Sequence, residues 1–303
     1  MKHLSLENPR HKQLQQGFSD WLELTGYAAT SVYGMSNCMR EFLHWIEQEH
    51  IQLEDIIPVV VHRYFFHLKH RKKQKRIACS ASGGGALSTN YLHKHVQSIK
   101  KFSHYLKETG QGSFEIDILL PEQKSKIPEI LTKEEIKQLY EACESSPIGL
   151  RDRAMVSIYY GCGLRRTEGV SLDITDFLPD KKVLYVRKGK NYRERYVPLT
   201  SEIKHDLQEY VNYGRKALLQ DKSEPAFFIS ERGTRPQGQS LIIRLKILAS
   251  KAGIPKNIGL HVLRHSIATH LLQSGMSLQN IARFLGHASL ESTQIYTHIA
   301  HNR

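Results

Sequence analysis

Six side chains, spread over four separated stretches of the sequence, could together cleave a phosphodiester bond. The stretches are "GLRRTEGVSL", "RKGKNYRERYVPL", "HVLRH" and "LGHASLESTQIY". Their candidate groups are guanidinium, ammonium, imidazole or phenol, and they belong to Arg165, Lys188, His261, Arg264, His287 and Tyr296. His261 and Arg264 stand three residues apart, so both should project from one face of a helix.

These residue types suit phosphoryl transfer to a tyrosine. Two arginines can hold the nonbridging oxygens of a phosphodiester and stabilise the charge of its transition state. A tyrosine hydroxyl can attack phosphorus and hold one strand covalently. A lysine or histidine can protonate the leaving hydroxyl or accept the tyrosine's proton. Because the sequence shows no carboxylate cluster for Mg²⁺, we expect a reaction without metal, ATP or other cofactor.

Taken one at a time, these residues also have structural interpretations. Arg165 could be a cation at a helix C-terminus, Lys188 a solvated turn residue, and His261 a cap. Tyr296 stands among apolar residues at helical spacing in "QIYTHIA", so an amphipathic helix could bury it for packing alone. Only the combination of the four stretches favours the catalytic interpretation.

The stretches fall on recognisable elements of the second half of the chain. In "LTKEEIKQLYEAC", Thr132 as N-cap with Glu135 three residues later forms a capping box that opens a helix. "LRDRAMVSIYYGCG" predicts a buried helix closed by glycine, and "KVLYVRKGKNYRERYVPLT" predicts a β-hairpin with Lys188 at its tip. From about residue 200 the pattern is mostly helical, with a short strand at "AFFIS".

The first 110 residues predict four helices, because apolar residues recur there at steps of three and four. Residues 111–130 lack a sustained period and include Pro121 and Pro128, which is typical of a linker. The predicted protein is mainly α-helical with two domains. A helical domain over residues 1–110 and a linker over 111–130 precede an α-rich domain with a small antiparallel β-sheet over 131–303.

The composition points to a polyanionic partner. The 303 residues carry 43 Lys and Arg against 30 Asp and Glu, a formal net charge of +13. This excess favours nucleic acid over an acidic membrane surface, because no apolar run approaches the roughly 18 residues of a spanning helix. The opening "MKHLSLENPRHKQLQQ" lacks the apolar stretch of a signal peptide, so we expect a cytoplasmic protein without a membrane partner.

Much of the charge of the first domain is local. Residues 63–76 hold seven Lys and Arg and no acid, and a Gly- and Ser-rich loop, "IACSASGGGALS", follows them. Such a run can be a solvated helix end, but with the global charge excess a phosphate-binding patch is at least as strong an interpretation. The candidate DNA contacts of the whole chain are Arg71, Lys72, Lys73, Lys75, Arg76, Arg166, Lys190 and Arg193.

Neither cysteine nor histidine spacing indicates a metal site. Cys38, Cys79, Cys143 and Cys162 are scattered without a C-x-x-C pair, so we expect reduced, structural thiols. The histidines of "HVLRHSIATH" and "LHKHV" do not form H-E-x-x-H and have no cysteine or carboxylate at ligand spacing.

In their order along residues 130–300, "GLRRTE", "RKGKNYRERYVPL", "HVLRHSIATHLLQSG" and "LGHASLESTQIYTHI" resemble the motifs of tyrosine recombinases, the Xer recombinases and phage-type integrases in particular. The resemblance implies a SAM-like core DNA-binding domain followed by a tyrosine recombinase catalytic domain. It implies that Tyr296 is the nucleophile, that Lys188 is the general acid and that His261 accepts the tyrosine's proton. The phosphate would be held by Arg165, Arg264 and His287, and Glu168 would support Arg165.

The resemblance also implies the substrate and the assembly. The substrate would be double-stranded DNA with a specific recombination site, and the reaction would pass through a 3′-phosphotyrosine and a Holliday junction. The assembly would be a homotetramer on two duplexes, with a second recombinase or accessory protein as a further option. The biological role would be that of a mobile-element enzyme, or resolution of chromosomes or plasmids, or inversion. Two rival functions are a non-cleaving DNA-binding factor with the same fold and a type IB topoisomerase-like relaxing enzyme. The compact first domain argues against the second.

Two departures from the family pattern lead to expectations of their own. Gly169 stands where relatives carry a larger apolar residue, so we expect looser packing behind Arg165. Seven residues follow Tyr296, so we expect that protomers dock through a short peptide, that the sequence as given is shortened, or that assembly uses another surface.

Overall fold

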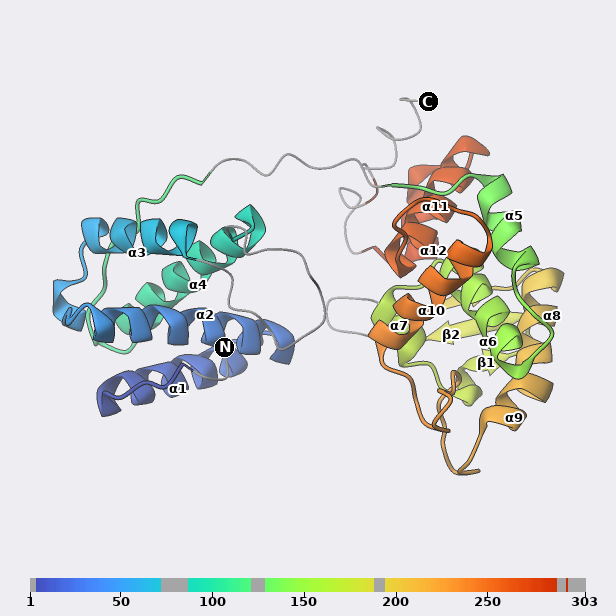
Figure 1. The fold of residues 1–303 in the computed structure, drawn as a ribbon, viewed down its shortest axis with the longest axis horizontal. Coiled ribbons are helices and arrows are strands. Elements are labelled where there is room, and N and C mark those ends of the chain that lie inside the picture. The colour runs from blue at the N-terminus through green and yellow to red at the C-terminus, as the bar shows by residue number, and fades with distance from the viewer. Residues whose placement is uncertain (1–3, 72–86, 121–128, 188–193, 288–292, 294–303) are drawn as a thin grey trace. The chain divides into compact units, whose positions relative to one another are not determined.

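The computed structural model describes residues 4–71, 87–120, 129–187, 194–287 and 293. The chain divides into two compact units, Met1–Ser125 and Lys126–Arg303, called unit 1 and unit 2 below (Figure 1). The boundary between them lies inside the segment 111–130.

Unit 1 is built from helices that enclose one aromatic core. Their bounds are α1 (Pro9–Leu24), α2 (Ala29–Gln48), a 3₁₀ turn η1 (Leu53–Asp55), α3 (Pro58–His70) and α4 (Thr89–Glu108). Asn8 and Ser88 cap α1 and α4 with side-chain acceptors, which satisfies backbone N–H groups that a helix start leaves unpaired. The largest fully buried side chains include Phe18, Phe42, Tyr64 and Phe102. The four helices predicted for this part of the sequence are confirmed.

Part of the segment predicted as a linker packs on unit 1. Phe114, Ile116, Ile118 and Leu120 lie partly buried against its core. The Ser103 hydroxyl donates a hydrogen bond to the Phe114 carbonyl at 2.6 Å and accepts one from the Phe114 N–H at 3.1 Å. Residues 114–120 therefore belong structurally to unit 1.

Unit 2 is a helical assembly around a small sheet. Its helices are α5 (Lys133–Glu141), α6 (Pro147–Val156), α7 (Arg166–Val170), α8 (Ser201–Glu209), α9 (Lys216–Leu218), α10 (Gly238–Lys251), α11 (Leu260–Gln273) and α12 (Leu278–Leu285). Between them are π-helical turns η2 (Ser157–Gly161) and η4 (Tyr210–Arg215) and a 3₁₀ turn η3 (Ile174–Asp176). The predicted capping box is present at α5, where Thr132 and Glu135 bond reciprocally.

The sheet has three antiparallel strands in the order β1 (Phe177–Leu178), β2 (Val183–Val186) and β3 (Arg195–Pro198). Val186 pairs with Arg195, which confirms the predicted hairpin, although its tip lies outside the described residues. The stretch "AFFIS" contributes an isolated bridge from Ala226 to Asp173 and not the expected strand. Its aromatic residues Phe227 and Phe228 are buried in the core.

The fold class is confirmed: two units, mainly helical, with a small antiparallel sheet in the second. The helix predicted over "LRDRAMVSIYYGCG" is α6 continued by the π turn η2, and it ends before Gly163, whose φ of +62° favours glycine. Across the described ranges, no helix is long and apolar enough to cross a membrane.

Candidate active site

Four of the six candidate catalytic residues lie in the described part of unit 2. Arg165 is the residue before α7, His261 and Arg264 lie on α11, and His287 stands two residues after the end of α12. Lys188 and Tyr296 lie outside the described residues, so their placement stays a prediction.

Both candidate arginines bind the C-terminal end of α12. Arg165 donates from Nη1 to the Leu285 carbonyl at 3.3 Å and from Nη2 to the Gly286 carbonyl at 3.1 Å. Arg264 donates from Nη2 to the same Leu285 carbonyl at 2.8 Å and from Nη1 to the Gly163 carbonyl at 2.6 Å. The two guanidinium groups, predicted from stretches 99 residues apart (165 and 264), therefore converge on one backbone oxygen. The negative end of the helix dipole stabilises them there.

The end of α12 is shaped for this contact. Gly286 adopts a left-handed conformation with φ +67° and ends the helix, so the carbonyls before it are left without helical partners. The arginines supply the missing donors. The C-terminal end of α12 thereby fixes both guanidinium groups at the residues that immediately precede His287.

Glu168 is the acidic centre of the cluster. Its carboxylate accepts from the Arg165 N–H at 2.8 Å and from Arg165 Nη1 at 2.8 Å. Arg195 reaches both of its oxygens, at 3.1 and 3.0 Å, and Arg264 Nη1 lies 3.8 Å away. Burial raises the pKa of Glu168, but the hydrogen bonds and positive charge of Arg195, and then the hydrogen bonds from Arg165, outweigh it and lower the pKa to about 2. The expectation that Glu168 supports Arg165 agrees with these contacts.

Arg195 is a site residue that the sequence interpretation missed. Besides the Glu168 fork, its Nε donates to the Phe284 carbonyl of α12 at 3.0 Å, and its side chain is only 9% exposed. A signal was present in the sequence: on β3, Arg195 is in phase with the buried Val197, so period-two alternation turns it inward. A charged residue on the inward face of a strand requires an internal partner.

The histidines near the arginines are held in their neutral form. Burial, then the charges of Arg166, Arg264 and Arg165, lowers the pKa of His261. Burial and neighbouring charges also lower the pKa of His265 and of His287, each to about 4. His287 Nδ1 lies 2.7 Å from the buried Thr293 hydroxyl, which orients its ring. At neutral pH each of these rings can therefore accept a proton.

The packing behind Arg165 is tight, contrary to the expectation drawn from Gly169. A Cβ atom added at Gly169 would lie 2.5 Å from the Tyr159 hydroxyl oxygen and 2.6 Å from Cζ of the same ring. The Tyr159 hydroxyl also donates to the Arg166 carbonyl at 3.1 Å. The fully buried Tyr159 ring thus fills the space that a larger side chain at position 169 would need.

The candidate DNA contacts occupy different settings. Arg166 is exposed at the first position of α7, and its aliphatic stem lies beside Gly238. Arg71, at the end of α3, forms an ion pair with the buried Glu41. The remaining six candidates lie outside the described residues, and they are Lys72, Lys73, Lys75, Arg76, Lys190 and Arg193.

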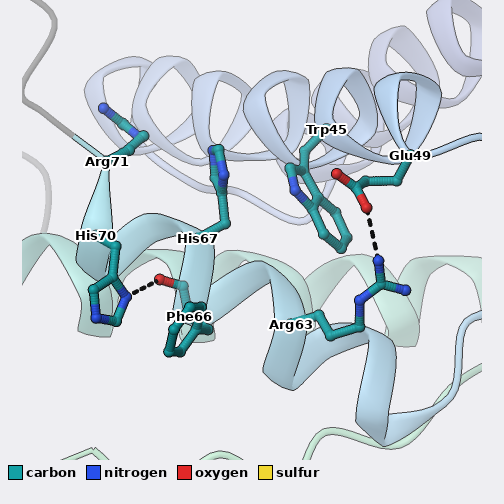
Figure 2. A pocket seen from close by; sticks show the side chains of 7 residues that line it. All are labelled: Trp45, Glu49, Arg63, Phe66, His67, His70 and Arg71. Atoms are coloured by element: carbon teal, nitrogen blue, oxygen red, sulfur yellow. Dashed lines mark hydrogen bonds and ion pairs between the residues drawn. The ribbon is translucent and has the colours of Figure 1, made fainter.

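Arg71 also borders a cavity of about 470 Å³ between α2 and α3 in unit 1 (Figure 2). Trp45 and Phe66 give it apolar walls. Arg63 and Glu49 also line it and form an ion pair, with 2.7 Å between Nη2 and Oε2. His67 and His70 complete the lining. The basic stretch of α3 therefore presents aromatic as well as cationic surface.

In the part of the chain that the structure covers, no group of three or more His, Cys, Asp and Glu side chains is arranged to hold a metal ion. Cys38, Cys143 and Cys162 are free thiols, and Cys79 lies outside the described residues. Among the described residues, the candidate site thus combines three arginines with neutral histidines and the carboxylate of Glu168.

Comparison with known proteins identifies the family. Residues 129–303 match the model of the phage integrase family. The chain is 39% identical over 212 residues to tyrosine recombinase XerD of Proteus mirabilis, covering 69% of this chain and 67% of the relative. It is 31% identical over 280 residues to tyrosine recombinase XerD of Corynebacterium glutamicum, covering 90% and 89%.

Solved structures share the fold. The chain matches a crystal structure of XerA recombinase with a TM-score of 0.52 and 26% identity, covering 94% of this chain and 93% of that one. It matches XerH site-specific recombinase, in a post-cleavage complex with palindromic difH substrate, with a TM-score of 0.72 and 22% identity, covering 97% and 82%. With the arginine cluster of unit 2, these matches show that the chain belongs to the phage integrase family and is a tyrosine site-specific recombinase.

Proposed function

We propose that this recombinase cleaves and rejoins double-stranded DNA at a specific site through a 3′-phosphotyrosine on Tyr296. One observation carries the proposal: the guanidinium groups of the partly buried Arg165 and the buried Arg264 meet at the Leu285 carbonyl, two residues before His287. Fixed donors in a site shielded from water are suited to a charge that develops on phosphorus oxygens, because they need no reorganisation during the reaction.

The chemical step is balanced by two proton transfers. The Tyr296 oxygen forms a bond to phosphorus while the bond from phosphorus to the 5′ oxygen breaks. His261 accepts the tyrosine's proton, and Lys188 gives a proton to the departing 5′ oxygen. The lowered pKa of His261 supports its role, because a neutral imidazole can accept a proton at neutral pH. Attack by a 5′ hydroxyl reverses the step and rejoins the strands.

We further propose that strand exchange proceeds through a Holliday junction in a homotetramer on two duplexes. Residues 1–110, together with residues 114–120 that pack on them, would form a SAM-like core-binding domain, and residues 131–303 would form a catalytic domain. The net charge of +13 supports binding to DNA. A mobile-element function, resolution or inversion would all use this chemistry.

DNA contacts outside the reaction centre are proposed for two regions. The exposed Arg166 stands beside the arginine cluster on α7. In unit 1 the basic residues 63–76 would bind phosphate. Of this stretch, Arg63, His67 and His70 line the cavity between α2 and α3 (Figure 2). Arg71 would act mainly through its ion pair with Glu41, which fixes the end of α3.

The test is capture of the covalent intermediate. Cells that express the chain from its own locus are lysed in denaturant, and DNA that remains bound to the protein is sequenced to give the site. Nicked duplexes with that site should then trap an adduct, and mass spectrometry should find the nucleotide on Tyr296. Tyr296→Phe should abolish the adduct and leave DNA binding nearly intact. Tyr213→Phe, at an exposed tyrosine of unit 2, is the matched control. An adduct in Tyr296→Phe would refute the assignment.

The proton donor can be tested with a leaving group that needs no proton. A duplex with sulfur in place of the 5′ bridging oxygen releases a thiolate, which is far more stable than an alkoxide. Lys188→Ala should cleave normal DNA slowly and the sulfur substrate at nearly the wild-type rate. Lys190→Ala, two residues further along the chain, is the comparison, and rescue of that variant instead would move the role to Lys190.

A further inference from the structure

Three arginines share one carboxylate in unit 2, and one of them has no role in the proposed reaction. Arg165, Arg195 and Arg264 all approach Glu168. We propose that Arg195 is a positioning residue: it occupies Glu168 so that the charges of Arg165 and Arg264 stay available to the phosphate. This inference rests on the proposed function.

The geometry gives Arg195 the largest share of the carboxylate. Its Nη1 and Nη2 bind the two oxygens in a fork at 3.1 and 3.0 Å. Arg165 uses only Nη1 on this carboxylate and turns Nη2 toward the Gly286 carbonyl, while Arg264 stays 3.8 Å away. Without Arg195, a buried carboxylate would draw the other two guanidinium groups toward itself.

The net charge of the cluster supports the same conclusion. Three guanidinium groups and one carboxylate leave an excess of two positive charges in a site where all four side chains are at least 85% buried. A phosphodiester carries one negative charge, and its pentacoordinate transition state carries two. Removal of Arg195 would halve the excess, and the loss should be felt most where the negative charge is greatest.

Arg195 also joins two elements of the site. It begins β3 opposite Val186, in the hairpin that is predicted to carry Lys188 in its connecting turn, and its Nε binds the Phe284 carbonyl of α12. A lysine at this position could not make the fork and the third bond together, because its ammonium is a single point of charge. The arginine thus sets the distance between the hairpin and the helix end that precedes His287.

The experiment compares two substrates in Arg195→Met and Arg195→Lys. One is a nicked duplex with the site recovered by adduct sequencing. The other is the same duplex with a methylphosphonate at the scissile position, whose transition state carries one negative charge in place of two. We expect Arg195→Met to slow cleavage of the phosphodiester about 100-fold and of the methylphosphonate less than about 10-fold. Arg195→Lys keeps the charge but loses the fork, so it should show most of the slowing seen in Arg195→Met, and wild-type rates in Arg195→Lys would overturn the positioning role.

Arg244→Met is the matched control. Arg244 lies on α10 and binds the buried Asp152 with two nitrogens, so its loss also leaves a buried carboxylate without its fork, away from the arginine cluster. Any loss of activity in this variant should be equal on the two substrates. The double variant Glu168→Gln/Arg195→Met should cleave the phosphodiester faster than Arg195→Met alone, because the competing carboxylate is gone.

Equal slowing of both substrates by Arg195→Met would overturn the inference, since it would indicate only lost stability. Wild-type cleavage by the variant would overturn it as well. The proposed function fails separately, if Tyr296→Phe forms the adduct or if Arg165→Ala cleaves the phosphodiester at the wild-type rate.

Discussion

Glu168→Gln removes the one negative charge from a cluster of three arginines whose side chains are at most 15% exposed, and should therefore destabilise unit 2. Glutamine keeps the shape of the protonated acid but cannot accept from Arg165 and Arg195 as a charged group. The variant should then unfold as if Glu168 were permanently protonated, and the difference from wild type measures how strongly the arginines favour the carboxylate.

The magnitude follows from the pKa of Glu168, which the structure lowers from 4.5 to about 2. The side chain is 6% exposed, so solvent screens the interaction little. A depression of this size corresponds to about 3 kcal/mol of stability at pH 7. Because the folded pKa lies below the unfolded one, this stability is complete above pH 4.5 and is lost as the pH falls toward 2. By pH 3.5 the wild type should have lost about 1.4 kcal/mol of it.

The chain allows the two units to be followed separately. Both tryptophans, Trp21 and Trp45, lie in unit 1, so tryptophan fluorescence reports the unfolding of that unit. Far-UV circular dichroism reports both units. In urea at pH 7, the unfolding of unit 2 should give a transition in circular dichroism that tryptophan fluorescence does not show. Glu168→Gln should lower the free energy of unfolding obtained from this transition by about 3 kcal/mol. Glu141→Gln, at an exposed glutamate on α5, is the control and should change stability by less than about 0.5 kcal/mol.

The pH dependence of the same variant gives a second test. The difference between Glu168→Gln and wild type should shrink from about 3 kcal/mol at pH 7 to about 2 kcal/mol at pH 3.5. A difference that stays constant with pH, or a shift of the fluorescence transition of equal size, would refute the assignment of a low pKa to Glu168.

Two further predictions concern residues around the cluster. Gly169→Ala should destabilise unit 2 by about 1–3 kcal/mol in the same urea assay, because the new methyl group would meet the Tyr159 ring; a change within about 0.5 kcal/mol would show that the ring can move aside. The pKa of His287, lowered to about 4, should appear in an NMR titration of the free protein as a midpoint near pH 4, on a resonance that His287→Asn removes. Unit 2 should accordingly lose stability as the pH falls below 6.5, where the unfolded histidine takes up its proton; a midpoint near 6.5 would contradict the burial of this ring.

The catalytic half of the fold was predictable from the sequence because its signals are local. Thr132 and Glu135 define a helix start by reciprocal hydrogen bonds within four residues, and the hairpin follows from alternation on two neighbouring runs. The stretch "AFFIS" shows the limit of such signals. Its buried aromatics resemble a strand, but the stretch forms only the isolated bridge between Ala226 and Asp173, and tertiary packing determines the rest.

The site was predictable in its residue types and not in its connections. Arg165 and Arg264 could be chosen from their motifs, whereas their common contact with Leu285 depends on how α12 packs beside the Gly163 turn. The looser packing expected at Gly169 was wrong for the same reason, since the Tyr159 ring that fills the space comes from ten residues upstream. Sequence spacing along one element does not reveal which side chain of another element fills a gap.

Arg195 shows what the connections add to the chemistry. An arginine inside a recombinase site is easily taken for another phosphate ligand, but its three described bonds go to Glu168 and to the Phe284 carbonyl. Arg195 therefore donates its hydrogen bonds to groups of the protein, which leaves the donors of Arg165 and Arg264 less constrained by the Glu168 carboxylate. We therefore expect the geometry of the side chain at position 195 to affect the rate of phosphodiester cleavage more than its charge does. Arg195→Lys tests that difference directly, because it keeps the charge and removes the fork.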